Sequence, residues 1–186
     1  MKRGFDLLLA LFGVLIFFLP LIIVAVVVRL TSPGPILYWS DRVGRDNRLF
    51  KMPKFRSMKI CTPAVATHLL SNPDAFLTPV GGFLRKSSLD ELPQLWSIFK
   101  GDMSFVGPRP ALFNQHDLIE LRTQAKVHHL TPGLTGWAQI NGRDELPIPV
   151  KVQMDIEYMK KQSIFFDIKI IILTIFKVIT SDNVAH

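Results

Sequence analysis

Two adjacent carboxylates, Asp90 and Glu91, and an arginine between two prolines, Arg109, are the residues best suited to chemistry in this sequence. A carboxylate that stays ionised beside a phosphate can bind Mg²⁺, act as a general base or attack phosphorus as a nucleophile. The flanking prolines stiffen the backbone around Arg109, which suits its guanidinium to bidentate phosphate binding and to stabilising charge in phosphoryl transfer. An ordinary loop salt bridge is the alternative for Arg109. The pattern indicates a site for anionic chemistry.

The start of the helix that carries the acidic pair is open to two interpretations. Ser88 and Glu91 match a capping box, in which Glu91 would cap the helix rather than take part in chemistry. Pro93 argues against that match, because it would be the fifth helical residue and lacks the N–H that this position needs. With Asp90 as the N-cap, Pro93 is the third helical residue and its missing N–H costs nothing. We therefore expect Asp90 at or beside the helix N-terminus, where backbone N–H groups favour an ionised carboxylate and attract phosphate.

Basic and amide side chains elsewhere are candidates to complete a phosphate site. The candidates for substrate and phosphate binding are Lys54, Arg56, Arg85, Asn141 and Arg143. The first two belong to a polybasic stretch that could instead grip anionic lipid headgroups. The last two lie in residues 131–143, whose glycines would let the backbone approach a ligand closely. A simple turn would also explain the Asn-Gly pair there.

Composition and charge restrict the partners. The 186 residues suit a single domain, and 48% of them are hydrophobic. A formal net charge of +7 favours anionic partners such as phosphates or a lipid surface. We expect no nucleic-acid partner, because the sequence has no helix-turn-helix or RNA-recognition motif and a membrane segment lies close by. The single cysteine, Cys61, allows no intramolecular disulfide.

An uncharged run from Leu7 to Val28 is long enough to span the ~30 Å hydrocarbon core of a bilayer. Pro20 lies inside this run and predicts a bend, because proline removes a helix hydrogen bond and clashes with the preceding turn. Positive residues flank both ends, with Lys2 and Arg3 before the run and a basic series from Arg29 onward. If both flanks stay cytoplasmic, the helix must enter and leave on the same side of the membrane. A single-span anchor is the alternative, and the residues alone do not decide between the two.

The segments after the membrane run predict short elements. Residues 31–35 predict a turn that ends the helix, and residues 36–59 combine β-type side chains with a Gly-Arg-Asp-Asn turn. The helix that follows the acidic pair is expected to end at Gly101. One apolar face of that helix is formed by Leu92, Leu95, Trp96 and Phe99.

The C-terminal third predicts three more helices. Two are amphipathic, one over residues 111–127 and one around residues 152–159. The strongly apolar stretch 164–179 is interrupted by three charged residues, so we expect it to lie in the membrane interface rather than to span. Burial in the domain core is the alternative. The fold class is therefore a helix-rich α/β domain with short strands and no full Rossmann sheet, since no Gly-x-Gly-x-x-Gly follows a strand.

Three motifs, taken in order, resemble one known family. They are SSLDELPQLW at 87–96, KGDMSFVGPRP at 100–110 and TPGLTGWAQINGR at 131–143. They are similar to the motifs of the bacterial sugar transferases, the monotopic phosphoglycosyl transferases. The resemblance covers almost the whole chain and corresponds to the family's minimal catalytic core.

The resemblance implies an enzyme that transfers a sugar-1-phosphate from a UDP-sugar to a polyprenol phosphate, usually undecaprenyl phosphate, and releases UMP. It implies Asp90 as the nucleophile that forms a covalent phosphosugar intermediate. It also implies that Glu91 and Mg²⁺ support this step, with the acidic pair as the metal site, and that Arg109 binds phosphate. Anionic membrane lipid is a further expected partner, and a homodimer stays open.

The resemblance also favours the bent form of the membrane segment. It implies a re-entrant helix over residues 1–30 and a catalytic domain over residues 31–186 at the membrane interface. A monotopic protein on the cytoplasmic face of the bacterial inner membrane is the implied location. Two positions depart from the family pattern. The helix break is Leu19-Pro20 rather than Ser-Pro, so the bend rests more heavily on proline, and Gly82 stands where many members carry a basic residue.

A non-catalytic protein that binds anionic lipid through its polybasic segment is the competing hypothesis. It predicts liposome binding that does not depend on Asp90 and no release of nucleotide. The close spacing of the acidic pair, Arg109 and the Asn141–Arg143 segment favours the enzyme.

Overall fold

The computed structural model describes residues 2–63, 72–142 and 146–180 of the chain. Its helices and strands within these ranges run in the order α1 Lys2–Thr31, β1 Leu37–Val43, η1 Arg45–Asn47, β2 Leu49–Phe55, η3 Pro73–Phe76, α2 Gly81–Lys86, η4 Leu89–Gln94, α3 Leu95–Lys100, β3 Ser104–Val106, α4 His116–Gln124, η5 Val127–His129, β4 Gly133–Thr135, α5 Trp137–Ile140, α6 Ile148–Lys161 and α7 Ile164–Thr180. The prediction of a helix-rich α/β protein with short strands is confirmed.

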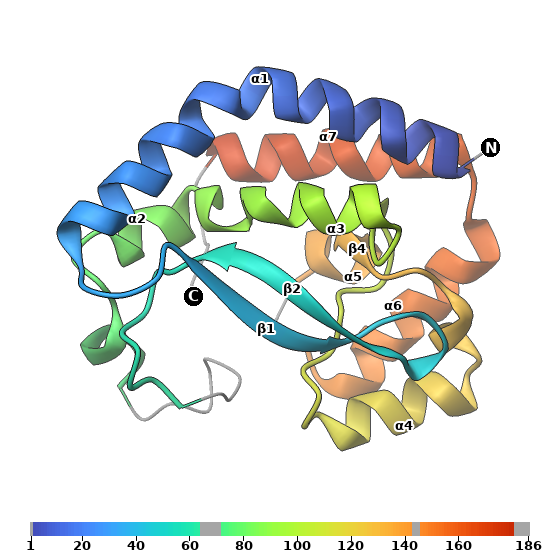
Figure 1. Cartoon of the computed structure of the whole chain (residues 1–186). Helices are drawn as coiled ribbons and strands as arrows, with labels where there is room; N and C mark the ends of the chain where they lie inside the picture. The colour runs from blue at the N-terminus through green and yellow to red at the C-terminus, as the bar shows by residue number, and fades with distance from the viewer. Residues whose placement is uncertain (1, 64–71, 143–145, 181–186) are drawn as a thin grey trace.

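The apolar N-terminal run forms one 30-residue helix, α1, with Pro20 inside it. Among the described helices, α1 is the one long and apolar enough to cross a membrane by length and composition. Figure 1 shows that it arches along the molecule, with its two halves running in different directions. The turn predicted after it is confirmed, since α1 ends at Thr31.

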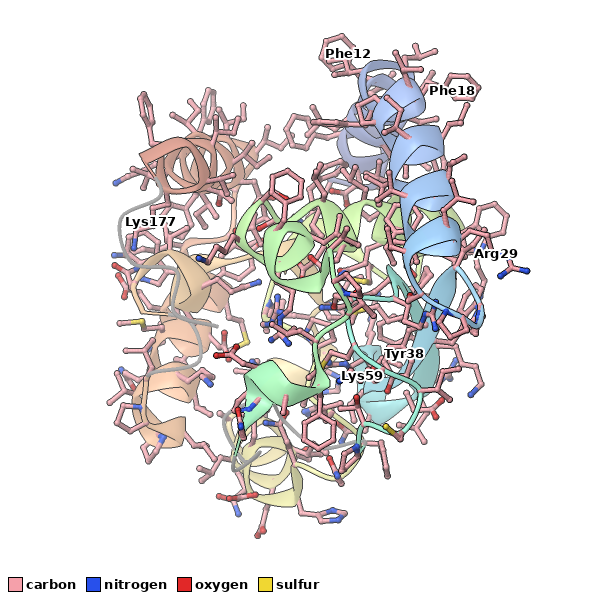
Figure 2. All side chains as sticks on the ribbon, turned by 90° about the vertical axis from the view of Figure 1, so that its left-hand side faces the viewer. Phe12, Phe18, Arg29, Tyr38, Lys59 and Lys177 are labelled. Carbon is pink, nitrogen blue, oxygen red and sulfur yellow. The ribbon has the colours of Figure 1, made fainter. Side chains whose placement is uncertain are left out.

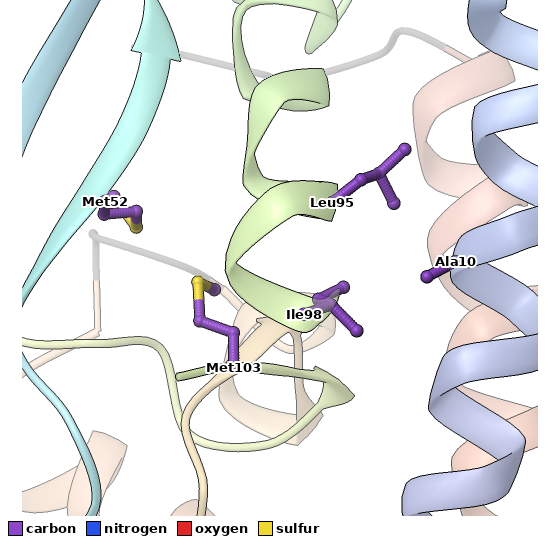
Figure 3. Packing of buried hydrophobic residues seen from close by; sticks show 5 residues of the cluster. All are labelled: Ala10, Met52, Leu95, Ile98 and Met103. Atoms are coloured by element: carbon purple, nitrogen blue, oxygen red, sulfur yellow. The ribbon is translucent and has the colours of Figure 1, made fainter. Parts of the chain in front are cut away.

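Both halves of α1 pack against the rest of the protein. In the N-terminal half, Ala10 is fully buried, and it shares a hydrophobic cluster with Leu95 and Ile98 of α3 and Met52 of β2 (Figure 3). In the C-terminal half, Val28 belongs to a second buried cluster, which joins it to β2 and α2. Helix α3 therefore lies between α1 and the β1–β2 hairpin, and it directly follows η4, the segment with the acidic pair.

The sheets are small. Strands β1 and β2 pair antiparallel, with Leu37 opposite Phe55 and Tyr38 opposite Lys54. Their connection contains Asp46 and Asn47 in the left-handed region, so the predicted hairpin turn is confirmed. The second sheet pairs β3 and β4 in parallel.

The second sheet brings together two of the sequence motifs through their glycines. A Cβ at Gly133 would lie 2.1 Å from the backbone nitrogen of Gly107, and one at Gly136 would lie 2.1 Å from its carbonyl oxygen. Both positions therefore require glycine for the approach of one backbone to another. Packing between the segments 104–107 and 133–136 therefore explains these two glycines, and the approach of a ligand to this stretch stays a prediction.

Helix α4 is shorter than the predicted helix over residues 111–127. It begins at His116, because Leu112 lies in a turn where its N–H donates to the side chain of Gln115. It ends at Gln124, and the left-handed Lys126 then separates it from η5. The prediction of helices around 152–159 and over 164–179 is confirmed by α6 and α7.

Helices α1 and α7 present apolar side chains at the same end of the molecule. Figure 2 shows both helices there, with Phe12 and Phe18 of α1 pointing outward. On α7, Phe165 is 86% exposed while Ile170 is fully buried. Helix α7 therefore combines a face in the core with an exposed apolar face. The burial alternative describes the first face, and a position in the membrane interface stays a prediction.

Candidate active site

The acidic pair lies in η4, a short 3-10 segment that continues into α3. Ser88 precedes it with φ 57°, and its carbonyl accepts a hydrogen bond from the Glu91 N–H at 3.1 Å. An α-helix from Leu89 would press the Pro93 ring against the Leu89 carbonyl, whereas the tighter 3-10 form bonds residues three apart. Ser88 and not Asp90 is therefore the N-cap, but Asp90 is the second residue of η4 and so lies at the N-terminus of this segment, as expected.

The capping box is not formed either. Ser88 occupies the position before the segment, but its side chain makes no capping hydrogen bond. The side chain of Glu91 is turned instead to Lys54 and Arg109. The prediction that the following helix ends at Gly101 is confirmed, because Gly101 follows Lys100 with φ 94°.

Glu91 joins three segments that lie far apart in the sequence. Its Oε1 accepts a hydrogen bond from Lys54 Nζ of β2 at 2.7 Å and one from Arg109 Nη2 at 3.0 Å. Burial opposes ionisation of Glu91, but these two cations outweigh it and hold its pKa well below the usual range. Burial also lowers the pKa of Lys54, and Glu91 partly offsets that effect. The result is an ionised glutamate that fixes two cations at one point.

Asp90 lies beside this cluster in a different electrostatic setting. Asp90 is 6% exposed. Burial raises the pKa of its carboxyl to about 6, and the negative charge of Glu91 also raises it. Lys54 and Arg85 act in the opposite direction. A carboxylate of raised pKa is a better nucleophile than an ordinary aspartate, and it is still largely ionised at neutral pH.

The remaining candidates lie in different surroundings. Arg85 of α2 is close enough to act on the charge of Asp90, and its Nη1 lies 3.4 Å from the sulfur of Met58. Arg56 is 5% exposed, and its guanidinium donates to the carbonyls of Ser32 and Pro33, where it holds the turn after α1.

The two candidates from the third motif are not joined to this cluster. Asn141 follows α5 and donates to the Trp137 carbonyl at 2.7 Å, which closes the last turn of that helix. Arg143 lies outside the described residues. The structure therefore brings together Lys54, Glu91 and Arg109, with Asp90 and Arg85 beside them.

Two residues behind Arg109 were missed in the sequence. Arg122 of α4 donates its Nη1 to the carbonyl oxygen of Arg109 at 2.8 Å. Its Nε and Nη2 both donate to Asp155 Oδ2 of α6, at 2.9 and 2.7 Å. A signal was present, because Arg122 follows the core residue Leu118 by four positions and Asp155 follows the core residue Val152 by three, so each charge falls on the apolar face of its helix.

The acidic pair can serve as a magnesium site only together with substrate. The described residues contain no group of three or more histidine, cysteine, aspartate or glutamate side chains that could hold a metal. Mg²⁺ commonly binds one or two protein carboxylates and completes its shell with substrate phosphates and water. Asp90 and Glu91 supply the two carboxylates, so the side chains present fit a magnesium ion bound with a diphosphate.

Comparisons with known proteins agree with the motifs. The family model described as "Bacterial sugar transferase" matches residues 1–181. The chain is 41% identical over 185 residues to the UDP-glucose:undecaprenyl-phosphate glucose-1-phosphate transferase of Escherichia coli (strain K12), covering 95% of this chain and 40% of that protein. It is 40% identical over 189 residues to the uncharacterized sugar transferase EpsL of Bacillus subtilis (strain 168), covering 100% of this chain and 91% of that protein.

The name of a third relative states a sugar other than glucose. The UDP-N-acetylgalactosamine-undecaprenyl-phosphate N-acetylgalactosaminephosphotransferase of Aeromonas hydrophila is 36% identical over 185 residues, covering 96% of this chain and 44% of that protein. The chain thus spans less than half the length of the two relatives whose names state a substrate, and most of the length of the B. subtilis relative.

Proposed function

This chain belongs to the bacterial sugar transferase family, and from that premise we propose that it transfers a sugar-1-phosphate from a UDP-sugar to undecaprenyl phosphate and releases UMP. Both substrates stand in the names of relatives from E. coli and A. hydrophila. The observation that carries the proposal is the meeting of Lys54 and Arg109 on Glu91, beside a buried Asp90 of raised pKa. This arrangement combines a nucleophile with cations for a diphosphate.

The first half of the proposed reaction uses Asp90 as the nucleophile. One Asp90 carboxylate oxygen attacks the β-phosphorus of the UDP-sugar, and the bond from that phosphorus to the bridging oxygen of UMP breaks. UMP leaves with the electron pair, and the sugar phosphate stays on Asp90 as an acyl phosphate. Burial of Asp90 favours this step, because a carboxylate freed from water is a stronger nucleophile.

The second half uses the lipid acceptor at the same phosphorus. A phosphate oxygen of undecaprenyl phosphate attacks, the bond from phosphorus to the Asp90 oxygen breaks, and the Asp90 carboxylate is restored. The product is a polyprenyl diphosphate sugar. Because each substrate meets Asp90 in turn, the reaction follows ping-pong kinetics.

The cations beside Asp90 stabilise the charge that develops on phosphorus. Arg109 offers a planar fork to phosphate oxygens, and Lys54 adds a point charge from the neighbouring strand. Glu91 keeps both in place through its Oε1. Asp90 and Glu91 would hold Mg²⁺ together with the donor diphosphate, and the ion would supply neutralisation of phosphate charge that favours the departure of UMP.

A monotopic, re-entrant placement in the inner membrane, with the site on the cytoplasmic face, completes the proposal. Both ends of α1 are attached to the domain: Arg3 donates to the carbonyls of Ile98 and Phe99, and Val28 is buried against the domain at the other end. A helix that crossed the bilayer would carry its two ends to opposite sides, away from these partners. The exposed apolar side chains of α1 and α7 lie at one end of the molecule (Figure 2), which suits insertion into one leaflet.

Nucleotide release tests the proposed reaction. Purified protein with Mg²⁺, undecaprenyl phosphate and a panel of UDP-sugars is expected to release UMP with at least one donor, and Asp90→Asn is expected to release none. Asp41→Asn is a matched control, because Asp41 is a partly exposed aspartate that pairs with Lys51 on the hairpin, away from the acidic pair. Release of UDP instead of UMP would indicate an ordinary glycosyltransferase and would contradict the proposal.

A further inference from the structure

The Pro108-Arg109-Pro110 segment is held by donors from three other elements. Its three consecutive carbonyls accept hydrogen bonds from the Gly133 N–H at 2.9 Å, from Arg122 Nη1 at 2.8 Å and from Arg42 Nη1 at 3.1 Å. Two of the three residues are prolines and have no N–H, so the segment has little means of fixing itself through its own backbone. Donors from outside must therefore set where the backbone of Arg109 lies.

We propose that the buried Arg122–Asp155 pair is a positioning device for Arg109, and that it acts on the proposed sugar-phosphate transfer through that arginine alone. The inference rests on the proposed function for its effect on rate. A continuous chain of contacts supports it. Asp155 Oδ2 binds Arg122, Arg122 holds the carbonyl of Arg109, and Arg109 Nη2 reaches Glu91 Oε1 at 3.0 Å.

The geometry of Arg122 suits this task. Its guanidinium uses Nε and Nη2 on one carboxylate oxygen and directs Nη1 to the Arg109 carbonyl. Because the guanidinium is planar, binding Nε and Nη2 to Asp155 also fixes the direction in which Nη1 points. A lysine ammonium has no such fixed geometry. Arg122 is 7% exposed and Asp155 1%, so neither can exchange these contacts for water.

Burial indicates that the pair serves geometry rather than stability. It raises the pKa of Asp155 although Arg122 lies beside it, so the desolvation of the carboxylate exceeds the gain from pairing. A buried pair of this kind often adds nothing to stability when compared with apolar residues of similar volume. A cavity of about 30 Å³, lined in part by Pro108, Arg109 and Arg122, gives the segment room to shift if the contact is lost.

The test compares two variants in two backgrounds. Asp155→Asn is expected to slow UMP release about 10- to 100-fold, because misplacing a catalytic group by about 1 Å can cost on the order of 100-fold. In an Arg109→Lys background, the same change is expected to cost less than about threefold, since a flexible ammonium does not need the fixed backbone. Asp41→Asn, which removes the carboxylate of an exposed pair, is expected to leave the rate unchanged in both backgrounds.

A second variant separates a loss of rate from a loss of folding stability. Arg122→Met with Asp155→Leu removes both charges together, so no single charge stays buried, and it is expected to melt near the wild-type temperature. The rate of UMP release should nevertheless fall as in Asp155→Asn. Equal fold losses in the wild-type and Arg109→Lys backgrounds would overturn the proposal, because a general structural defect multiplies with the loss at Arg109.

Hydrogen exchange separates this inference from the proposed function. The backbone amides of Leu112, which donates to Gln115 Oε1, and of Val43, which donates to the Ala111 carbonyl, are expected to exchange faster in the double variant. The amides at the other end of the β1–β2 hairpin, around the Leu37–Phe55 pair, should stay as in the wild type. Faster exchange together with no UMP release from the wild-type protein would sink the proposed function and keep the positioning role. Unchanged exchange would overturn the positioning role whatever the activity.

Discussion

Asp90 and Glu91 are neighbours in the chain but have opposite electrostatic settings. Glu91 is held ionised by Lys54 and Arg109, whereas burial keeps Asp90 closer to its neutral form. A pair of carboxyls whose pKa values are driven apart can divide two roles. We therefore assign attack on phosphorus to Asp90 and the placement of the cations to Glu91.

The raised pKa of Asp90 predicts that Asp90→Asn is more stable than the wild type at neutral pH. The folded pKa, about 6, lies above the ordinary value of 3.8, so the folded state binds more protons between these values. The stability that this group contributes is present below pH ~4 and is lost as the pH rises through ~6, a loss of roughly 2–3 kcal/mol. Asparagine avoids this loss.

Thermal unfolding in chelator, at pH 4 and at pH 7.5, measures this effect. At pH 7.5 the melting temperature of Asp90→Asn should exceed that of the wild type by roughly 5 °C, and at pH 4 the difference should nearly vanish. The same variant should release no UMP. A wild type as stable as the variant at both pH values would contradict the burial argument.

At the residue scale, the sequence indicates which side chains suit phosphate chemistry. It does not indicate which of them meet in the folded protein, because those contacts join segments far apart in the chain. The flanking prolines single out Arg109, and the polybasic stretch singles out Lys54; the structure brings both to Glu91. Arg56 has the same side-chain chemistry but meets the turn after α1, which no local pattern shows. The pairing of Arg122 with Asp155 depends on the packing of α4 against α6. The sequence indicates this pair only through the position of each charge on the apolar face of its helix.

At the scale of elements, the contact of β3 with β4 holds the arginine segment in register. The Gly133 N–H donates to the Pro108 carbonyl, and a Cβ on Gly133 would strike the Gly107 nitrogen at 2.1 Å. The sequence showed glycines but not which backbone they face, because β3 ends at Val106 and β4 begins only at Gly133. Turn-forming residues predict the β1–β2 hairpin, but no local residue pattern predicts the pairing of β3 with β4.

This contact predicts that Gly133→Ala disrupts the site. The added methyl must push the two strands apart, so the melting temperature and the rate of UMP release should both fall, the rate by at least about tenfold. Gly82→Ala is the matched control, since its Cβ would meet only Leu77 Cδ1, at 3.7 Å. Gly82 lies inside α2, so this change should leave stability equal or raise it by up to ~1 kcal/mol. A Gly133→Ala protein as active as the Gly82→Ala control would exclude the proposed role of the strand contact.

The ends of elements were predicted where a single residue dictates them. Gly101 ended α3 as expected, and the segment 31–35 ended α1. The start of η4 was misplaced, because Pro93 was judged against an α-helix and the chain adopts a 3-10 segment. A proline excludes one geometry without choosing among the others.

At the scale of the whole molecule, the attachment of both ends of α1 predicts its topology. Near the N-terminus, Lys2 pairs with Asp167 of α7, which is 1% exposed and also accepts a hydrogen bond from Tyr158. The position that reports topology without breaking this pair is Gly4, where a Cβ would meet nothing within 4 Å. Cys61, which is exposed on the domain, supplies an internal reference for the side on which the domain lies.

Labelling of a Gly4→Cys variant with a membrane-impermeant maleimide tests this prediction. In intact cells neither the thiol introduced at position 4 nor that of Cys61 should react, and in inverted membrane vesicles both should react. Combining Gly4→Cys with Cys61→Ser leaves a single thiol and identifies the signal from position 4. Labelling of position 4 from outside intact cells, with Cys61 protected, would show a spanning helix.

Under the proposed function, the arrangement of the whole molecule would bring a water-soluble donor and a membrane-bound acceptor to one site. The apolar faces of α1 and α7 lie at one end, and α3, which continues from the segment of the acidic pair, packs beneath α1 (Figure 1). An acceptor phosphate at headgroup level and a nucleotide sugar from the aqueous side would then both reach Asp90. The proposed covalent intermediate would let the two substrates use one pocket in turn.

Intact-mass measurement of the protein after incubation with its UDP-sugar and Mg²⁺, without acceptor, tests the central claim most directly. We predict a mass increase equal to one phosphosugar, located on Asp90 by peptide mapping, absent in Asp90→Asn and removed by undecaprenyl phosphate. An active enzyme that shows no adduct and releases UMP only when donor and acceptor are both present would contradict the covalent mechanism.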